Sequence, residues 1–132
     1  MIKILITGDR NWKDHIVIGE AILRAVKESN IVNSAHEVTI VHGGARGADT
    51  IAGEIGEQFG FKVRRMPAQW EKYGRAAGPI RNQQMLDENK DIDICLSFHH
   101  NLELSKGTRD MVNRVNKAGI SHRHYDGRND PD

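Results

Sequence analysis

Residues 38–60 read VTIVHGGARGADTIAGEIGEQFG, and this stretch decides the fold. The β-branched run at 38–41 is typical of a buried strand and ends in the glycine turn at 42–44. Apolar residues then recur at helical spacing over 48–59, and Gly60 ends the helix at its C-terminus. A strand that a glycine turn joins to a helix is the repeating unit of an α/β fold.

The same alternation extends over the rest of the chain. It predicts a parallel sheet with helices on both faces, a doubly wound sheet of four or five mainly parallel strands. We expect one domain over 1–126 and a flexible C-terminal tail over 127–132. The remaining strands are predicted at 2–7, 61–66, 92–98 and, at the edge, 120–125; the remaining helices at 14–29, 79–89 and 107–118; and a polar connection at 30–36.

Composition excludes several classes of protein. The chain has 132 residues with 19 Lys and Arg against 18 Asp and Glu, and a net charge of +1 rules out a polycationic arm or an acidic tail. A single cysteine excludes a disulfide framework and a thiolate-cluster metal site. The apolar runs are far shorter than the ~20 residues that span a bilayer, so we expect a soluble, cytoplasmic protein without a membrane partner.

The strand-to-helix loops are the predicted functional region, because right-handed crossovers bring them all to the carboxyl edge of a parallel sheet. Small residues in the loop at 42–49 let backbone N–H groups converge on an anion such as phosphate, although a tight turn with close helix–sheet packing explains them equally well. Asp49 either complements the helix dipole or hydrogen-bonds a ribose or base. The ligand-binding candidates in this loop are Gly43, Gly44, Ala45, Arg46, Gly47 and Asp49.

A basic segment at 62–81 carries six Lys or Arg and one Glu in a nearly neutral chain. If Pro79 opens the next helix, Arg81 lies in its first turn, where the helix dipole disfavours a cation unless an anion is bound. The alternative is a solvated arginine with an acidic neighbour. Trp70 and Tyr73 could stack on a base, or could anchor the loop as buried aromatics.

Two further loops reach the same predicted edge. One opens the helix at 107–118 and could contact a phosphate or ribose, unless Ser105 or Thr108 simply caps that helix. The other directly follows the first strand. Their ligand-binding candidates are Gly8, Arg10, Ser105, Lys106, Gly107 and Thr108.

Other chemistry-bearing residues are not expected to form a site. The histidine pairs at 99–100 and at His122 and His124 have no acidic or thiolate partner at metal-ligand spacing, so we expect no metal and no cofactor. Cys95 lies within an apolar strand and is expected to be an inert core residue.

Four motifs stand at the predicted edge: GDR at 8–10, HGGARGAD at 42–49, WEKYGRAAGPIRN at 70–82 and SKGTR at 105–109. Together they resemble the SLOG superfamily of Rossmann-like domains, and most closely its small YspA-like branch, which is often found in phages and mobile elements. The resemblance covers roughly residues 2–125, and the motifs at 42–49 and 70–82 are its most specific parts.

The resemblance implies a Rossmann-like domain that binds a nucleotide or nucleotide-derived ligand, either a nucleoside phosphate or an ADP-ribose-like molecule. By position, the three glycines of 43–47 would contact the phosphate or ribose, and 107–108 would form a second phosphate-binding turn. Arg81 falls where the related LOG enzymes, which cleave N-glycosidic bonds of nucleoside monophosphates, place a functional arginine. A homodimer is a further expectation from the family. The motif at 70–82 supplies the candidates Arg75, Gly78, Arg81 and Asn82.

One departure from the family concerns catalysis. The LOG enzymes carry a glutamate implicated in catalysis, and Met111 stands at its position. Glycosidic cleavage needs a carboxylate, so hydrolysis is left open, with Arg81 and Asp49 as the catalytic candidates. The alternative function is single-stranded DNA binding, because 45–49 also resemble the Smf/DprA proteins and the basic segment could contact phosphates. A net charge of +1 provides little positive charge for contacts with several DNA phosphates, so we expect a nucleotide-derived small molecule rather than DNA as the ligand.

Overall fold

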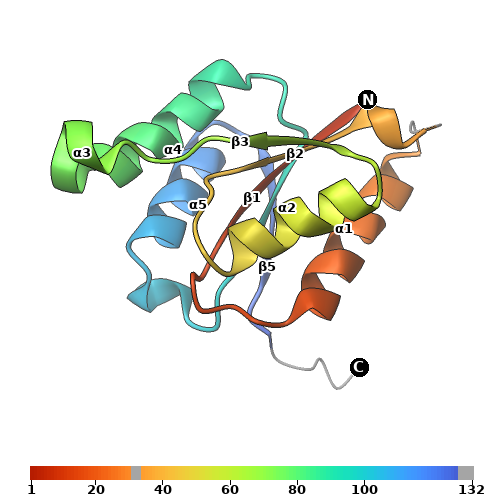
Figure 1. The fold of residues 1–132 in the computed structure, drawn as a ribbon, viewed down its shortest axis with the longest axis horizontal. Helices are drawn as coiled ribbons and strands as arrows, with labels where there is room; N and C mark the ends of the chain where they lie inside the picture. Colours follow the sequence, from red (N-terminus) through yellow and green to blue (C-terminus); the bar gives the residue numbers. More distant parts are fainter. Residues whose placement is uncertain (31–33, 128–132) are drawn as a thin grey trace.

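The computed structural model describes residues 1–30 and 34–127, which form a five-stranded sheet in the order β3-β2-β1-β4-β5 (Figure 1). Every neighbouring pair of strands is parallel, so the predicted α/β class is confirmed with five strands. Residues 31–33 of the predicted polar connection and 128–132 of the predicted tail lie outside the described residues. The strands are β1 (Ile2–Gly8), β2 (Val38–His42), β3 (Lys62–Arg65), β4 (Ile94–Phe98) and β5 (Ser121–Tyr125).

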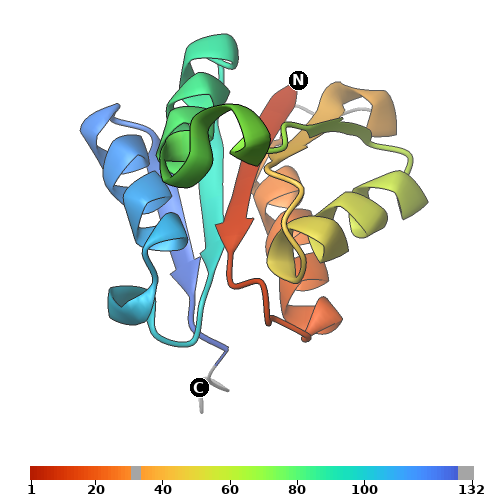
Figure 2. The same ribbon diagram turned by 60° about the vertical axis from the view of Figure 1, so that its left-hand side comes forward.

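Helices cover both faces of the sheet, as Figure 2 shows. On one face, α1 (His15–Ser29) and α2 (Ala48–Gln58) pack on Ile4 and Ile6 of β1. On the other face, α4 (Ala77–Glu88) and α5 (Gly107–Lys117) pack on Leu5, which lies between Ile4 and Ile6 in the sequence. Successive side chains of a strand point to opposite faces, so one strand serves both cores. The described residues also include three short 3-10 turns: η1 (Ala35–Glu37), η2 (Gly74–Ala76) and η3 (Leu102–Leu104).

Part of the predicted loop before α4 is helical. Residues 70–76 fold as the short helix α3 (Trp70–Tyr73) followed by η2. Helix α4 then begins at Ala77, so the prediction that Pro79 opens the helix is wrong. A proline fits at the third helical position because the first N–H groups of a helix have no intrahelical partner. Arg81 therefore lies beyond the first turn, and its conflict with the helix dipole is weaker than predicted.

Cys95 lies in β4 and is buried and free. Burial raises the pKa of its thiol to about 12, which agrees with the expected inert core residue. Among residues 1–30 and 34–127, no helix combines the length and the apolar composition that crossing a membrane requires.

Candidate functional site

A cleft of about 550 Å³ opens at the carboxyl edge of the sheet, between the loops after β1, β2 and β4 and the start of α4. This is the edge at which the sequence predicts a ligand. Four predicted residues do not line the cleft: Gly43, Gly44, Arg46 and Gly47. The predicted residues that do line it are Gly8, Arg10, Ala45, Asp49, Arg75, Gly78, Arg81, Asn82, Ser105, Lys106, Gly107 and Thr108.

Asp49 holds the loop between β2 and α2 in shape. Its Oδ2 accepts hydrogen bonds from the amides of Gly43 (3.1 Å) and Ala45 (3.2 Å), while the amide of Gly44 donates to Nδ1 of His42 (3.0 Å). Burial raises the pKa of Asp49 to about 6, although these amides and the charge of Arg81 act in the opposite direction. Three consecutive amides of the loop are thus already bound to the protein's own acceptors.

The glycines of this loop make room for neighbouring groups. A Cβ on Gly43 would overlap Nη1 of Arg81, and a Cβ on Gly44 would lie 2.6 Å from Nε of Arg65. Gly47 has a φ of +75°, and a Cβ there would overlap the backbone oxygen of Asp9. In the structure these three glycines therefore serve the close packing that the sequence left as an alternative to phosphate contact.

Arg81 joins α4 to the glycine loop. Its Nη1 donates to the carbonyl oxygens of Gly43 (2.7 Å) and Met66 (3.3 Å), and its Nε donates to Oδ1 of Asn82 (3.1 Å). Burial lowers the pKa of Arg81, and the nearby carboxylate of Asp49 partly opposes that shift. Its Nη2 makes no hydrogen bond with the described residues, so one edge of a well-held guanidinium is free in the cleft.

The start of α5 forms the opposite wall. The amide of Thr108 donates to Oγ of Ser105 (3.0 Å), so Ser105 caps the helix. The Thr108 side chain lines the cleft at 4% exposure, and its hydroxyl has no hydrogen-bond partner in the described part of the chain. Asn82 fastens this helix to α4, because its Nδ2 donates to Oδ2 of Asp110 (2.9 Å).

Sequence reasoning gave no site role to His99 or Asp110, and both line the cleft. Nδ1 of His99 accepts from the amide of Asn101 (2.9 Å), so the neutral ring carries its proton on Nε2, which lies 4.0 Å from Oδ2 of Asp9. His99 directly follows β4, and the rule that places strand ends at the carboxyl edge could have found it. Asp110 lies in the first turn of α5, where an acid is ordinary and draws no attention.

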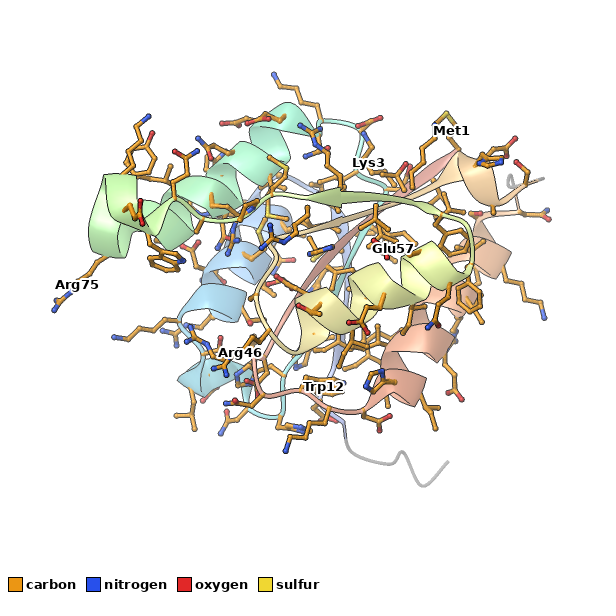
Figure 3. The ribbon with its side chains drawn as sticks, in the orientation of Figure 1. Met1, Lys3, Trp12, Arg46, Glu57 and Arg75 are labelled. Atoms are coloured by element: carbon orange, nitrogen blue, oxygen red, sulfur yellow. The ribbon has the colours of Figure 1, made fainter. Side chains whose placement is uncertain are left out.

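The arginines of the predicted basic segment do not all gather in the cleft. Arg64 pairs with Glu88 (3.1 Å), and Arg81 is half-buried in the cleft wall. Arg65 covers Gly44, and Figure 3 shows the side chain of Arg75, which belongs to η2, extending away from the body of the molecule. The charge that the sequence concentrates in 62–81 is therefore divided between β3, α3 and the cleft lining.

The C-terminal histidines contact a serine. Oγ of Ser97 lies 2.7 Å from Nε2 of His122 and 2.7 Å from Nδ1 of His124, bridging β4 and β5. Within residues 1–30 and 34–127, no group of three His, Cys, Asp or Glu side chains is arranged to hold a metal ion.

A parallel sheet with a cleft over its carboxyl edge defines a Rossmann-like α/β domain. Residues 2–73 match the model of the YspA, cpYpsA-related SLOG family, and the chain belongs to this family. Gene 61 protein of Mycobacterium phage D29 is 38% identical over 125 residues, covering 91% of this chain and 93% of that protein. The resemblance to the YspA-like branch is thus confirmed, with a phage relative.

The fold is also similar to the X-ray structure of DNA processing protein A (DprA) from Streptococcus pneumoniae, with a TM-score of 0.63 and 15% sequence identity. The match covers 94% of this chain and 50% of the other, so the chain spans half the length of DprA in that structure. At this level of identity the similarity supports the fold.

Proposed function

We propose that this chain binds a nucleotide or nucleotide-derived ligand, a nucleoside phosphate or an ADP-ribose-like molecule, in the cleft. The proposal depends on Thr108, whose side chain lines the cleft and whose hydroxyl has no partner among the described residues. This hydroxyl is open to the cleft, so it can donate a hydrogen bond to a ligand phosphate. The N-terminal end of α5 favours the same anion.

Cationic side chains in the same cleft support an anionic ligand. Arg81 is the best positioned, because two backbone carbonyls hold its Nη1 while its Nη2 makes no bond to the described residues. A guanidinium that is already fixed loses little further freedom when it binds an anion. The volume of about 550 Å³ lies within the range of small-molecule sites, roughly 300–1,000 Å³. The cationic residues that line the cleft are Arg10, Arg75, Arg81 and Lys106, although the Arg75 side chain extends away from the body of the molecule (Figure 3).

Cleavage of an N-glycosidic bond is the less supported half of the proposal. Met111, at the position of the LOG glutamate, is 1% exposed and packs in the core. Asp110 lines the cleft, but hydrogen bonds from Arg114 and Asn82 outweigh its burial and lower its pKa. Asp9 and Asp49 are the remaining carboxylates of the cleft. Incubation with AMP followed by chromatography decides the question, because hydrolysis releases adenine and binding alone leaves AMP intact.

Titration calorimetry with AMP and ADP-ribose tests the binding proposal. We expect the native protein to bind at least one of them, and both Thr108→Val and Arg81→Ala to weaken that affinity by tenfold or more. Arg24→Ala is the matched control, since Arg24 is an exposed residue of α1 outside the cleft and its loss changes the net charge equally. A native protein that binds neither ligand, or an affinity unchanged by Thr108→Val, contradicts the proposal. Mass spectrometry of small molecules released from the purified protein identifies the ligand directly.

Single-stranded DNA binding is the second candidate, favoured by the exposed basic residues Lys62, Arg64 and Arg65 on the edge strand β3. DNA binding that neutralises several phosphates weakens steeply with salt. An affinity for oligo(dT) that falls more than tenfold between 50 and 200 mM salt (roughly the fall expected when several phosphates are contacted) supports this candidate, and a flat response rejects it. The homodimer expected from the family is a separate proposal, which sedimentation equilibrium tests.

A further inference from the structure

Trp70 is exposed in the cleft. It is 57% exposed, although large apolar side chains are usually buried. The other large hydrophobic residues found exposed in the described chain are Met1, Ile16, Leu23, Phe59 and Leu104, and none of these lines the cleft. Of the two sequence alternatives for Trp70, the structure does not support a buried anchor.

The indole of Trp70 packs beside helix α4. A Cβ on Gly78 would lie 3.5 Å from Cη2 of Trp70, an ordinary van der Waals contact, so the six-membered ring rests beside the first turn of α4. Helix α3 is held by backbone hydrogen bonds of its own segment, because the amides of Lys72 and Tyr73 donate to the carbonyl oxygen of Gln69. Figure 1 shows α3 at the outer end of α4, beyond the sheet. The indole is thus positioned on a short helix while most of its surface stays accessible.

The chemistry of the cleft lining differs from place to place. Trp70, Gly78 and Pro79 supply an apolar part, whereas Thr108 and Lys106 belong to the polar wall at the start of α5. A ligand that satisfies both parts needs a flat apolar group and an anionic group. A nucleotide has both, in its base and its phosphate, whereas a sugar phosphate has only the second.

We propose that Trp70 is the stacking surface for the base of a nucleotide whose phosphate lies at Thr108 and Arg81. This inference rests on the proposed function and narrows it to ligands that carry a base. Stacking of a base on an aromatic side chain commonly changes affinity by about 5- to 150-fold. The same factor is therefore expected between AMP, which has a base, and ribose 5-phosphate, which does not.

Tryptophan fluorescence measures this directly, because the chain has two tryptophans and Trp12 is 2% exposed in the core. We expect AMP to quench the emission of Trp70 and ribose 5-phosphate to leave it nearly unchanged. In calorimetry, Trp70→Ala should lower the affinity for AMP about 5- to 150-fold and leave that for ribose 5-phosphate unchanged. The affinity of Trp70→Phe for AMP should lie between those of the native protein and Trp70→Ala. Phe59→Ala removes an exposed aromatic side chain outside the cleft, and its affinity for AMP should equal that of the native protein.

The outcomes separate the two proposals. Equal affinities of the native protein for AMP and ribose 5-phosphate, or an equal loss of both in Trp70→Ala, overturn the stacking role and leave phosphate binding in place. Failure of the native protein to bind AMP, ADP-ribose and ribose 5-phosphate overturns the proposed function and the stacking role together. Circular dichroism and the melting temperature show that Trp70→Ala, a change at an exposed position, is folded.

Discussion

The guanidinium of Arg81 occupies the space that a side chain on Gly43 would fill. Nη1 of Arg81 donates to the carbonyl oxygen of Gly43 at 2.7 Å, and a Cβ on that glycine would overlap the same nitrogen. The two residues are 38 positions apart and belong to the loop after β2 and to α4. One contact therefore positions the cleft arginine and holds the glycine loop. A substitution at either residue should consequently alter the conformation of the other.

Replacing Gly43 with alanine tests this relationship. Gly43→Ala should lower the free energy of unfolding by about 1–3 kcal/mol, because the new methyl group has to displace the guanidinium. Urea denaturation measures the loss. Gly19→Ala is the control, since the nearest atom to a Cβ there is 3.8 Å away. Alanine is more favourable than glycine in a helix interior by up to about 1 kcal/mol, so this change in α1 should not lower the free energy of unfolding. A Gly43→Ala protein as stable as the native one contradicts the packing that we describe.

Asp49 and His42 should give opposite pH dependences of stability. The pKa of Asp49 is raised from 3.8 to about 6 by burial, so its contribution to stability is fully present below pH 4 and is lost as the pH rises through 6. Burial and the charges of Arg65 and Arg81 lower the pKa of His42 from 6.5 to about 4. Its contribution is present above pH 6.5 and is lost as the pH falls through 4, so the two effects oppose each other between pH 4 and 6.

The variant Asp49→Asn removes one of these two opposing effects while keeping an oxygen that can accept from the loop amides. Its free energy of unfolding, relative to that of the native protein, should rise with pH between 4 and 6 by up to about 1.4 kcal/mol per pH unit. Urea denaturation at half-unit pH steps measures both proteins. Parallel stability curves over this range would show that Asp49 has an ordinary pKa in the folded state.

Periodicity and glycine turns were sufficient to predict the parallel sheet and the edge at which the cleft opens. They could not predict which groups the glycines of 42–47 serve, since the same small residues suit a bound phosphate and a packed arginine. That distinction depends on Arg81 and Arg65, which arrive from distant segments. Similarly, Pro79 marked the region where α4 begins, but not its first residue, because a proline is tolerated at several positions of the first turn. Long-range contacts decided the first point, and the local tolerance of a helix for proline the second.

Ser97 should contribute to stability through its two histidine partners. Nε2 of His124 lies 3.1 Å from the carbonyl oxygen of His99 and must donate to it, so Nδ1 of His124 accepts from Ser97, which in turn accepts from His122. Ser97→Ala should cost about 1–3 kcal/mol of unfolding free energy, because it leaves a ring nitrogen of the half-buried His122 and one of the exposed His124 without their shared partner. Ser121→Ala, at an exposed position of β5, is the control and should change stability by less than about 0.5 kcal/mol. If both variants lose the same unfolding free energy at pH 7.5, the hydrogen bonds of Ser97 to the two histidines do not stabilise the protein.

Met111 should not tolerate the glutamate that the LOG enzymes carry at the matching position. It is 1% exposed and packs with Leu5, Val41 and Met85, so Met111→Glu would bury an unpaired carboxylate. We expect a loss of several kcal/mol, smaller at pH 4 than at pH 8, because protonation removes the buried charge. Met111→Leu, which keeps the volume, should cost less than about 1.5 kcal/mol. Thermal unfolding at both pH values measures this, and a stable Met111→Glu protein that releases adenine from AMP would instead show that this position lies within reach of the ligand.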